Sequence, residues 1–527
     1  MNELISAEFK KNSQDQATKL GHEFESHEFE LDWLKKWSQY TPNRSALVDG
    51  DTQQELTYSQ MFDQAQKAAH LLKHKYNIGQ GDRVLHFSTN EVYSFVLYFA
   101  LARLGAMLVP INYRLTPREI TYLISNSEPA LIVYEQQYHG LLKEIEQDIH
   151  VPESHWLQIK GTSSSFVESV QKYTHKFEDF HSTTETTGMI IYTSGTTGFP
   201  KGAMISHKAL FWNSVNTALR LNITSTDSAV IFLPLFHTGG WNVLSTPFFH
   251  HGAQVVLTKK FDADQILNLS SKYKSTLLFG VPTTMGMMSR SNIFSTVDLS
   301  TIRYAIVGGE PMPIEQIEIW QKKNIPIRQG FGLTEFGPNV FSLGEADSIR
   351  KKGSIGFPNF YSEVSVRDDD GHALAADEIG ELWLKGPMCM TGYWKNPKAT
   401  AETIQDGWLK TGDLVRYDSE GYFYVVGRKK EMYKSGGENV YPVEIEQVIQ
   451  KLDWIKEAAV IGIHDDQWGE VGHAFVSVKG DYYDEQVLRE HCLKNLAKFK
   501  NPKFFTLLKD LPKGDSGKIL KRELKKI

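Results

Sequence analysis

The chain has 527 residues, of which 41% are hydrophobic and 23% are charged, a composition typical of a globular enzyme with more than one domain. Its formal net charge of -6 is small for this length, so no nucleic acid or other extended polyanion is expected as a partner. The two cysteines, Cys389 and Cys492, lack the spacing of a metal or disulfide framework, which favours a reducing, cytoplasmic compartment.

The N-terminal segment MNELISAEFKKNSQDQ has neither an apolar core nor a cleavage site, so we expect no signal peptide. The longest apolar run, Val92–Ala102, is followed at once by Arg103. It is shorter than the roughly 20 residues that span a bilayer, and it therefore predicts a buried core helix. No transmembrane segment is expected, which leaves peripheral association with a membrane as the alternative.

Helical and strand-like patterns alternate from Thr57 onward. Apolar spacing predicts a helix over Met61–Leu72, a buried strand over Arg83–Phe87, a helix that runs to Leu104, and a strand over Ala106–Pro110. Further strands are predicted at Ala130–Val133, Ala229–Phe232, Gln254–Leu257, Thr276–Gly280 and Tyr304–Val307. Strands separated by helix-length segments favour an α/β fold with parallel-rich sheets flanked by helices.

The sequence pattern changes in the last third of the chain. From about Gly353, glycine-rich alternation in GELWLKGP (Gly380–Pro387) and GYFYVVG (Gly421–Gly427) predicts antiparallel β-structure in a small barrel-like part. A basic stretch follows Gly427, and then a compact α+β unit with a helix over Pro442–Lys451 and strands over Ala458–Ile463 and Ala474–Val478. We therefore expect an N-terminal domain over residues 1–427 and a C-terminal domain over 428–527.

The stretch YTSGTTGFPKGAMISH, residues 192–207, has the chemistry of a phosphate-binding loop but not the GxxxxGK[ST] pattern. It lies between a predicted strand at Met189–Ile191 and a predicted helix at Ala209–Thr217, the usual place for such a loop. Lys201 adds a mobile positive charge. Tight turns and hydroxyl donors are expected from Thr193, Ser194, Gly195, Thr196, Thr197 and Gly198. From composition alone, a flexible surface loop is the alternative.

Other motifs follow in a fixed order along the chain. They are PLFHTGG (Pro234–Gly240), GGEPMP (Gly308–Pro313), QGFGLTEFGP (Gln329–Pro338), TGDLVR (Thr411–Arg416), GRKKEMYKSGGENVYP (Gly427–Pro442) and PKGDSGKIL (Pro512–Leu520). The ordered set resembles the ANL superfamily of adenylate-forming enzymes, in its acyl-CoA synthetase branch. The resemblance implies a large N-terminal AMP-binding domain and a small mobile C-terminal domain.

The resemblance also implies a nucleotide site that holds ATP and Mg²⁺. The loop from Thr193 to Lys201 would wrap the β- and γ-phosphates, and Thr334 would touch phosphate. Glu335 would hold Mg²⁺, with Thr193 as a second residue at the metal. Adenine would stack on Phe331, beside Gly332, with Gly308, Gly309, Glu310 and Pro311 on its other side. A lone Thr-Glu pair could instead cap a helix.

Ribose would be held by Asp413 and Arg428, although a lone Gly-Asp is also common in an Asx turn. The implied reaction has two halves: a carboxylate attacks the α-phosphate of ATP and releases pyrophosphate, and the thiolate of coenzyme A then displaces AMP. Lys518 would neutralise charge in the first half. The resemblance makes Lys430 the hinge for domain rotation, sets Lys434 and Asn439 near the adenylate, and sets Gly436 and Gly437 on the thiol path.

The acid is expected to be a fatty acid, with an aryl acid of the cinnamate or benzoate type second. His237 and Trp241, with Gly308 and Val340, would border the acyl site, which Gly239, Gly240, Phe248 and Phe249 would extend. No carboxylate follows Phe236 until Asp262, which argues against an amino-acid substrate. Each of these residues could equally be core packing.

Other functions are weaker alternatives. One is a stand-alone adenylating enzyme or a luciferase-like oxidase. The other is a nucleotide- or RNA-binding module that uses the basic tail, which lacks the aromatic interleaving that stacks bases. A monomer and a homodimer are equally compatible with the sequence.

Overall fold

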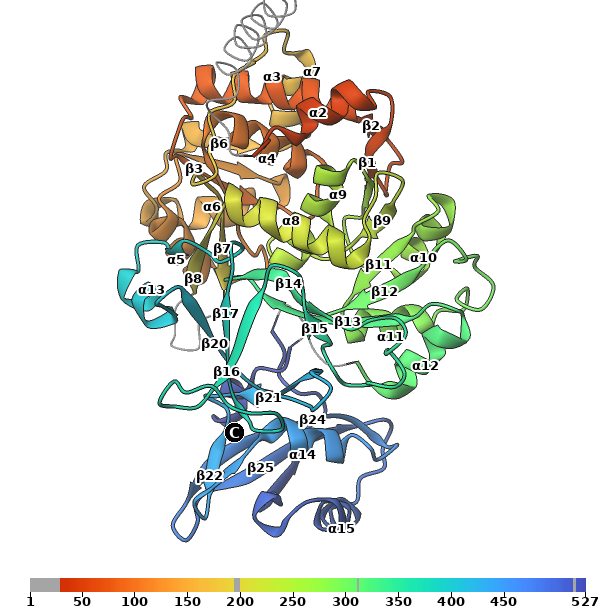
Figure 1. The fold of residues 1–527 in the computed structure, drawn as a ribbon. Helices are drawn as coiled ribbons and strands as arrows, with labels where there is room; N and C mark the ends of the chain where they lie inside the picture. Colours follow the sequence, from red (N-terminus) through yellow and green to blue (C-terminus); the bar gives the residue numbers. More distant parts are fainter. Residues whose placement is uncertain (1–28, 194–199, 310–311, 515–517) are drawn as a thin grey trace, which may run out of the picture. The chain divides into compact units, whose positions relative to one another are not determined.

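The computed structural model describes residues 29–193, 200–309, 312–514 and 518–527 (Figure 1). The chain divides into two compact units, one made of residues 1–260 with 390–395 and the other of 261–389 with 396–527. The expected boundary between residues 427 and 428 falls inside the second unit and stays a prediction. Among the described residues, no helix combines the length and the apolar character that crossing a membrane requires.

The main sheet of the first unit has a parallel centre. Its strand order is β18-β8-β7-β4-β3-β5-β6, and the pairs from β7 through β4, β3 and β5 to β6 are parallel. The bounds are β3 (Arg83–Phe87), β4 (Met107–Pro110), β5 (Leu131–Tyr134), β6 (Trp156–Gln158), β7 (Thr187–Thr193), β8 (Lys201–Ser206) and β18 (Gly392–Tyr393). β8 and β18 extend the sheet in the antiparallel sense.

The first helices confirm the predicted periodicity. Helix α3 (Tyr58–Tyr76) begins at Thr57, whose side chain accepts a hydrogen bond from the backbone of Gln60 in a capping box. Every residue of α4 (Tyr93–Leu104) is buried, as predicted for a core helix, and the helix ends at Gly105 with a φ of 72°. The unit also contains α2 (Trp33–Tyr40), α5 (Pro117–Ser127), α6 (His139–Glu144), α7 (Phe166–Lys172), α8 (His207–Leu221) and α9 (Ser245–His251).

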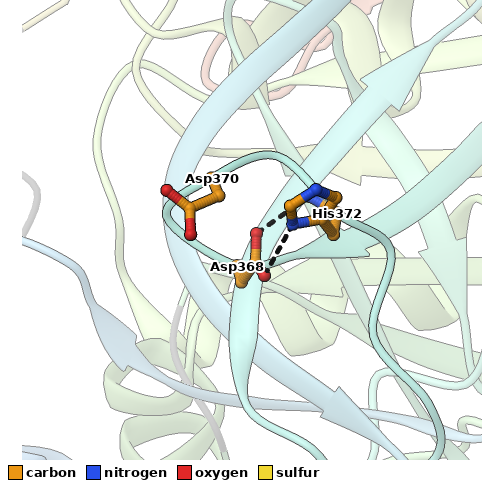
Figure 2. Close-up of side chains that lie close together, drawn as sticks. All are labelled: Asp368, Asp370 and His372. Carbon is orange, nitrogen blue, oxygen red and sulfur yellow. Dashed lines mark hydrogen bonds and ion pairs between the residues drawn. The ribbon is translucent and has the colours of Figure 1, made fainter.

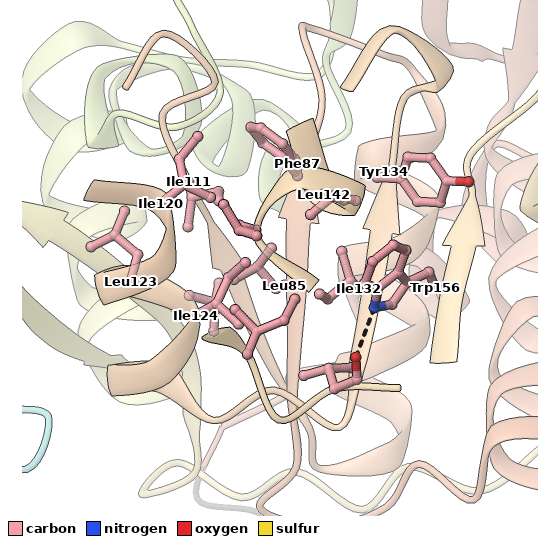
Figure 3. Packing of buried hydrophobic residues seen from close by; sticks show 14 of the residues in the cluster. Leu85, Phe87, Ile111, Ile120, Leu123, Ile124, Ile132, Tyr134, Leu142 and Trp156 are labelled. Atoms are coloured by element: carbon pink, nitrogen blue, oxygen red, sulfur yellow. Dashed lines mark hydrogen bonds between the residues drawn. The ribbon is translucent and has the colours of Figure 1, made fainter. Parts of the chain in front are cut away.

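Side chains of β3 and β5 pack against those of α5 in the core beside this sheet, as Figure 3 shows. Leu85 of β3 and Ile132 of β5 are fully buried there, and α5 contributes Ile120 and Ile124. The indole nitrogen of Trp156 donates to the carbonyl of Val151 at 3.0 Å, so its one polar atom is satisfied. This packing fixes α5 against the sheet.

A second sheet completes the first unit, with the order β2-β1-β10-β9. Its strands are β1 (Ser45–Asp49), β2 (Glu55–Thr57), β9 (Ser228–Ile231) and β10 (Gln254–Leu257). β1, β10 and β9 run parallel, and β2 joins β1 in the antiparallel sense.

The second unit begins with a mixed sheet. Its order is β11-β12-β13-β14-β15, with a parallel pairing of β11 (Leu277–Gly280), β12 (Tyr304–Val307) and β13 (Ile327–Leu333). β14 (Gly337–Ser342) and β15 (Phe357–Pro358) are antiparallel. The helices here are α10 (Ala263–Lys272), α11 (Pro282–Ser289) and α12 (Ile314–Lys322). The parallel-rich α/β prediction is therefore confirmed in both units.

A curled antiparallel half-barrel follows, as the glycine-rich alternation predicted. Its strands are β16 (Glu363–Arg367), β17 (Gly380–Lys385), β19 (Ile404–Gln405), β20 (Trp408–Tyr417) and β21 (Phe423–Arg428). Helix α13 (Pro397–Thr403) precedes β19. All pairings in this sheet are antiparallel, and β20 and β21 form a hairpin.

The last hundred residues form the predicted α+β element. Its sheet has the order β23-β22-β25-β24 with β26 on β25. The bounds are β22 (Tyr433–Ser435), β23 (Glu438–Val440), β24 (Ile455–Asp465), β25 (Gly469–Val478), β26 (Phe504–Leu507), α14 (Pro442–Ile449), α15 (Glu485–Asn495) and α16 (Lys521–Leu524). Ile445 of α14 and Leu488 of α15 are fully buried against the sheet, so this element has a core of its own.

Candidate active site

Strands β7 and β8 bring the chain into and out of the predicted phosphate loop. They are antiparallel neighbours, with Thr193 opposite Lys201 and Tyr192 opposite Gly202. The second half of the predicted loop, residues 192–207, forms strand β8 instead, and the predicted helix is confirmed as α8, which begins at His207 behind a Ser206 cap. The ammonium of Lys201 lies over the ring of Tyr393, 5.1 Å from its centroid. Ser194, Gly195, Thr196, Thr197 and Gly198 lie outside the described residues.

The predicted adenine and phosphate contacts sit at the end of β13. A Cβ on Gly332 would lie 2.2 Å from the backbone of Pro338 on β14, so only glycine fits between the two strands. The ring of Phe331 lies edge-on to Phe341, with centroids 5.9 Å apart. Thr334 and Glu335 form a half-buried turn between β13 and β14. That turn excludes the alternative in which Thr334 caps a helix.

Gly308 and Gly309 follow β12 at the same edge of the sheet. Gly309 has a φ of 87°, which favours glycine, and a Cβ on Gly308 would come within 3.7 Å of the carbonyl of Gly330 on β13. The backbone nitrogen of Met312 donates to Gln329 Oε1 at 2.8 Å. Glu310 and Pro311, which the sequence also predicts at this edge, lie outside the described residues.

Asp413 carries the most perturbed carboxylate of the site. It lies on β20 opposite Arg428 on β21, with its Oδ1 2.8 Å from the Arg428 Nε. Its Oδ2 is buried and has no hydrogen-bond partner among the described residues. Burial raises the pKa of Asp413 to about 6, against the opposing charges of Arg428 and Lys518. Because Asp413 lies in a strand, the Asx-turn explanation does not apply.

An unpaired carboxylate oxygen inside a protein costs free energy until a donor reaches it. The two hydroxyls of a ribose are donors of the required kind, and the carboxylate has two oxygens to receive them. Asp413 therefore fits the ribose of a nucleotide by its chemistry.

Glu335 supplies the carboxylate predicted for Mg²⁺. Its negative charge contributes to the raised pKa of Asp413, and also to that of Cys389, which burial raises to about 12. Carboxylate oxygens are the ligands that Mg²⁺ takes in proteins, and this negative field suits the cation. The residues present therefore fit Mg²⁺, whereas the metal role of Thr193 stays a prediction.

A separate group of possible metal ligands lies beyond β16. Figure 2 shows Asp368, Asp370 and His372 in an exposed loop, with His372 Nδ1 3.3 Å from Asp368 Oδ2. The backbone nitrogen of His372 also donates to Asp368 Oδ1 at 2.8 Å. These bonds close the turn that leads to β17, and turn formation accounts for the cluster.

The C-terminal motifs surround the short hairpin of β22 and β23. Lys434 faces Asn439 across it, and both side chains are exposed. Gly436 and Gly437 form its turn with φ values of 60° and 88°, and a Cβ on Gly436 would lie 3.1 Å from the Trp468 ring. Lys430 is exposed in the turn between β21 and β22. The roles of all these residues stay predictions.

Lys518 follows the last stretch of the chain that lies outside the described residues. Its carbonyl accepts a hydrogen bond from the backbone of Gly514 at 2.8 Å, and its side chain is exposed. Its charge lowers the pKa of Asp413, so the ammonium lies within electrostatic reach of that carboxylate. The catalytic role of Lys518 stays a prediction.

Three of the predicted acyl residues, Gly239, Gly240 and Trp241, lie in a π-helix, Gly239–Val243. A Cβ on Gly240 would lie 2.5 Å from the carbonyl of Pro234, which requires glycine there. Trp241 is fully buried, donates to the carbonyl of Leu235, and meets the ring of Phe95 edge-on.

His237 is half-buried beside Phe236. Phe248 and Phe249 are fully buried in this unit, and Val340 is fully buried on β14 of the other. Whether they border an acyl group stays a prediction.

One segment near the phosphate loop was not indicated by any motif. Residues 390–395 leave the second unit in sequence and add strand β18 to the sheet of the first unit, beside β8. No local pattern in TGYWK indicates this partner, because the pairing joins residues almost two hundred positions apart.

The chain matches known proteins over nearly its whole length. Residues 34–394 match the family model of the AMP-binding enzymes, and residues 444–518 match that of the AMP-binding enzyme C-terminal domain. A feruloyl-CoA synthase of Amycolatopsis sp. is 32% identical, over 94% of this chain and 98% of that protein. A long-chain-fatty-acid–CoA ligase of Mycobacterium tuberculosis is 33% identical, over 93% and 97% respectively.

Solved structures show the same likeness. The o-succinylbenzoate CoA synthetase of Bacillus subtilis, in complex with its acyl-adenylate intermediate, superposes with a TM-score of 0.84 at 30% identity over 94% of this chain and 98% of that one. The same enzyme in complex with ATP and a magnesium ion gives a TM-score of 0.83 at 30% identity, over 94% and 99%.

Proposed function

Because the chain belongs to the family of AMP-binding enzymes and is an AMP-forming acid–CoA ligase that uses ATP, Mg²⁺ and coenzyme A, we propose that the acid it activates is a fatty acid. An aryl acid of the cinnamate or benzoate type is the second candidate. Both kinds of acid occur in the names of relatives with almost equal identity, so the choice depends on this chain's own residues.

The observation that carries the proposal is the absence of formal charge from Pro234 to Thr258, the segment that contains the predicted acyl residues His237, Trp241, Phe248 and Phe249. Neither a lysine nor an arginine is available there for a second carboxylate, and neither an aspartate nor a glutamate for an amine. Burial lowers the pKa of His250 to about 3 and also lowers that of His251, so these imidazoles are neutral near pH 7. Such a segment favours an apolar acyl group with a single carboxylate over a dicarboxylate or an amino acid.

In the first half-reaction, an oxygen of the acid attacks the α-phosphorus and the bond to pyrophosphate breaks. Asp413 would hold the ribose hydroxyls while Arg428 keeps its carboxylate in place. Lys518 would reduce the repulsion between the acid and the α-phosphate, a contribution that is typically about 10²–10³-fold. Mg²⁺, held by Glu335, would neutralise charge on the phosphate oxygens.

In the second half-reaction, the sulfur of coenzyme A attacks the acyl carbon and the bond to AMP breaks. Rotation about Lys430 would replace Lys518 by the hairpin that carries Gly436 and Gly437. A turn of two glycines with positive φ presents backbone without side chains, which suits the narrow approach of a thiol.

The test is a panel of acids assayed for coenzyme A-dependent release of AMP. We expect kcat/KM to be higher for straight-chain fatty acids of graded length than for cinnamate, benzoate and their hydroxylated derivatives. A dicarboxylate and an amino acid serve as negative controls. A cinnamate or benzoate with the highest kcat/KM would replace the fatty-acid assignment by the aryl one.

A further inference from the structure

The predicted phosphate loop begins at the end of β7 and ends at the start of β8, which are neighbouring strands. The positions of the two loop ends therefore depend on how these strand ends are held. Tyr192 and Thr193 close β7, and Pro200 precedes Lys201, the first residue of β8. The ladder between β7 and β8 fixes the strands themselves. Tertiary contacts beyond this ladder join both strand ends to the same helix, α5.

Helix α5 carries one hydrogen-bonding group for each end. The phenol of Tyr192 donates to Asn126 Oδ1 at 2.6 Å, and the phenol of Tyr122 donates to the carbonyl of Pro200 at 3.1 Å. Tyr122 and Asn126 are four residues apart, so they project from the same face of the helix. The buried side chains of Ile120 and Ile124 anchor α5 against the sheet. Both loop ends are therefore hydrogen-bonded to one firmly packed helix.

Residues 390–395 join the same helix to β8 from another direction. The backbone nitrogen of Trp394 donates to the carbonyl of Gly202 at 2.7 Å, and its indole donates to the backbone carbonyl of Asn126 at 3.0 Å. Lys395 forms an ion pair with Glu128, just beyond α5, at 2.6 Å. Asn126 therefore receives one bond from the β7 end of the loop and another from the segment that covers β8.

We propose that Tyr122, Asn126 and Trp394 are positioning residues for ATP, which hold both ends of the phosphate-binding segment on α5. The inference rests on the proposed role of that segment in binding phosphates. Tyr122 and Asn126 are half-buried, and the two side-chain bonds described above join them to Pro200 and Tyr192, at the two ends of the loop. Loss of one bond therefore frees a loop end, weakens phosphate binding and leaves the sheet folded.

The test compares Tyr122→Phe, Tyr192→Phe and Trp394→Phe in the full-length protein. A buried hydrogen bond contributes about 0.5–1.5 kcal/mol, which corresponds to a roughly 2- to 10-fold change in affinity. We expect the Kd of each variant for Mg-ATP, measured by calorimetry without acid, to rise by that factor. The melting temperature of the ligand-free protein and the KM for the acid should stay close to the wild-type values.

Tyr134→Phe is the matched control. Its phenol lies on β5 of the same sheet and bonds His139 Nδ1 at 3.1 Å, away from the loop ends. The same hydroxyl deletion there should leave the Kd for ATP unchanged. A fall in ATP affinity equal to that of Tyr122→Phe would show a general effect of the sheet and contradict the proposal.

A double-mutant cycle gives a readout that a merely structural role would not produce. Tyr192→Phe and Asn126→Leu remove the same side-chain bond. The double variant should therefore weaken ATP binding by less than the sum of the free-energy losses of the two single variants. Tyr122→Phe and Tyr192→Phe remove different bonds and should be nearly additive. Wild-type ATP affinity in both tyrosine variants, or a parallel loss of ATP affinity, acid affinity and thermal stability, would overturn the proposal.

The outcome is separate from the choice of acid, because ATP binding is measured without any acid. A wild-type chain that binds ATP but prefers an aryl acid contradicts the fatty-acid proposal and leaves this one standing. A wild-type chain that binds ATP with a Kd insensitive to these variants contradicts only the positioning role, and a chain that binds no ATP contradicts both.

Discussion

Asp413 and Arg428 stand opposite each other on β20 and β21, and only one oxygen of the Asp413 carboxylate is paired. Its Oδ1 lies 2.8 Å from the Arg428 Nε, whereas Oδ2 is buried without a hydrogen-bond partner among the described residues. The half-satisfied carboxylate is costly to the ligand-free protein and complementary to a ligand with neighbouring hydroxyls. Stability and nucleotide binding should therefore respond in opposite directions to changes at this residue.

We predict that Asp413→Asn weakens ATP binding by at least tenfold and raises stability near neutral pH. The folded pKa of Asp413 is about 6, above the ordinary value of 3.8, so the folded state binds the proton more tightly than the unfolded state. Stability contributed by this group is thus lost as pH rises from about 4 to about 6. This net shift, which already includes the opposing charges of Arg428 and Lys518, corresponds to roughly 3 kcal/mol.

Melting temperatures of the wild type and the variant at pH 4.5 and pH 7.5 provide the measurement. The difference should favour Asp413→Asn more at pH 7.5 than at pH 4.5. Asp418→Asn is the control in the same hairpin, because Lys351 and several hydrogen bonds lower the pKa of Asp418 to about 2 against the effect of its desolvation. That variant should lose stability at both pH values. A difference for Asp413→Asn that does not depend on pH would contradict the role of its buried charge.

Lys518→Ala tests the division of labour between the two half-reactions. We expect acid- and ATP-dependent pyrophosphate release to fall by about 10²–10³-fold, since the positive charge that we propose for the α-phosphate and the acid is lost. Thioester formation from supplied acyl-adenylate should stay largely intact. Lys513→Ala controls for loss of a charge in the same segment, where Lys513 is paired with Glu457 at 2.5 Å. Equal loss in both halves, in a folded variant, would refute the assignment.

The sequence predicted individual elements well and their partners poorly. Three strands have the predicted bounds: Arg83–Phe87, Gln254–Leu257 and Tyr304–Val307. A short apolar run in the sequence is enough to predict a buried strand of this kind. In contrast, the predicted phosphate loop, residues 192–207, includes all of β8, since the glycine and lysine of this strand resemble the glycine-rich residues before it. Asn126 contacts β7 and Trp394, which are distant from it in the sequence. A local sequence pattern cannot predict such contacts.

The motifs predict candidate site residues, but they do not predict the neighbouring residues that hold those side chains in position. The resemblance predicts roles for Asp413, Arg428 and Glu335, and the structure adds that one carboxylate oxygen of Asp413 is buried without a hydrogen-bond partner among the described residues. Burial and pairing depend on the tertiary fold, so the raised pKa of Asp413 could not be derived from TGD alone.

Gly332→Ala tests the close approach of β13 and β14 that sets Thr334 and Glu335. The added methyl group would lie 2.2 Å from the Pro338 backbone, and a backbone cannot give way as a flexible side chain can. We expect a loss of about 3 kcal/mol or more in the free energy of unfolding, measured by urea denaturation. Gly79→Ala, where a Cβ meets nothing within 4 Å, should change it by less than about 1 kcal/mol. A Gly332→Ala protein of wild-type stability would show that the two strands can separate freely.

Gly436→Ala tests the proposed thiol path. Alanine there would adopt a φ of 60° and bring its methyl group within 3.1 Å of the Trp468 ring, which obstructs the turn between β22 and β23. We expect coenzyme A-dependent AMP release to slow by about tenfold or more, equivalent to roughly 1.4 kcal/mol in the barrier. Acid-dependent pyrophosphate release in a single turnover should stay near the wild-type rate.

Gly480→Ala separates backbone strain from obstruction of this path. Gly480 has a φ of 89° and open space around its Cβ position, so alanine there brings similar strain with no new contact. Both variants should lose a comparable, small amount of stability, because the strain of a positive φ is common to them. Only Gly436→Ala should slow the thioester step. If the two variants slow it equally, strain in the C-terminal element explains the effect, and the turn at Gly436 is not the route by which the thiol reaches the acyl group.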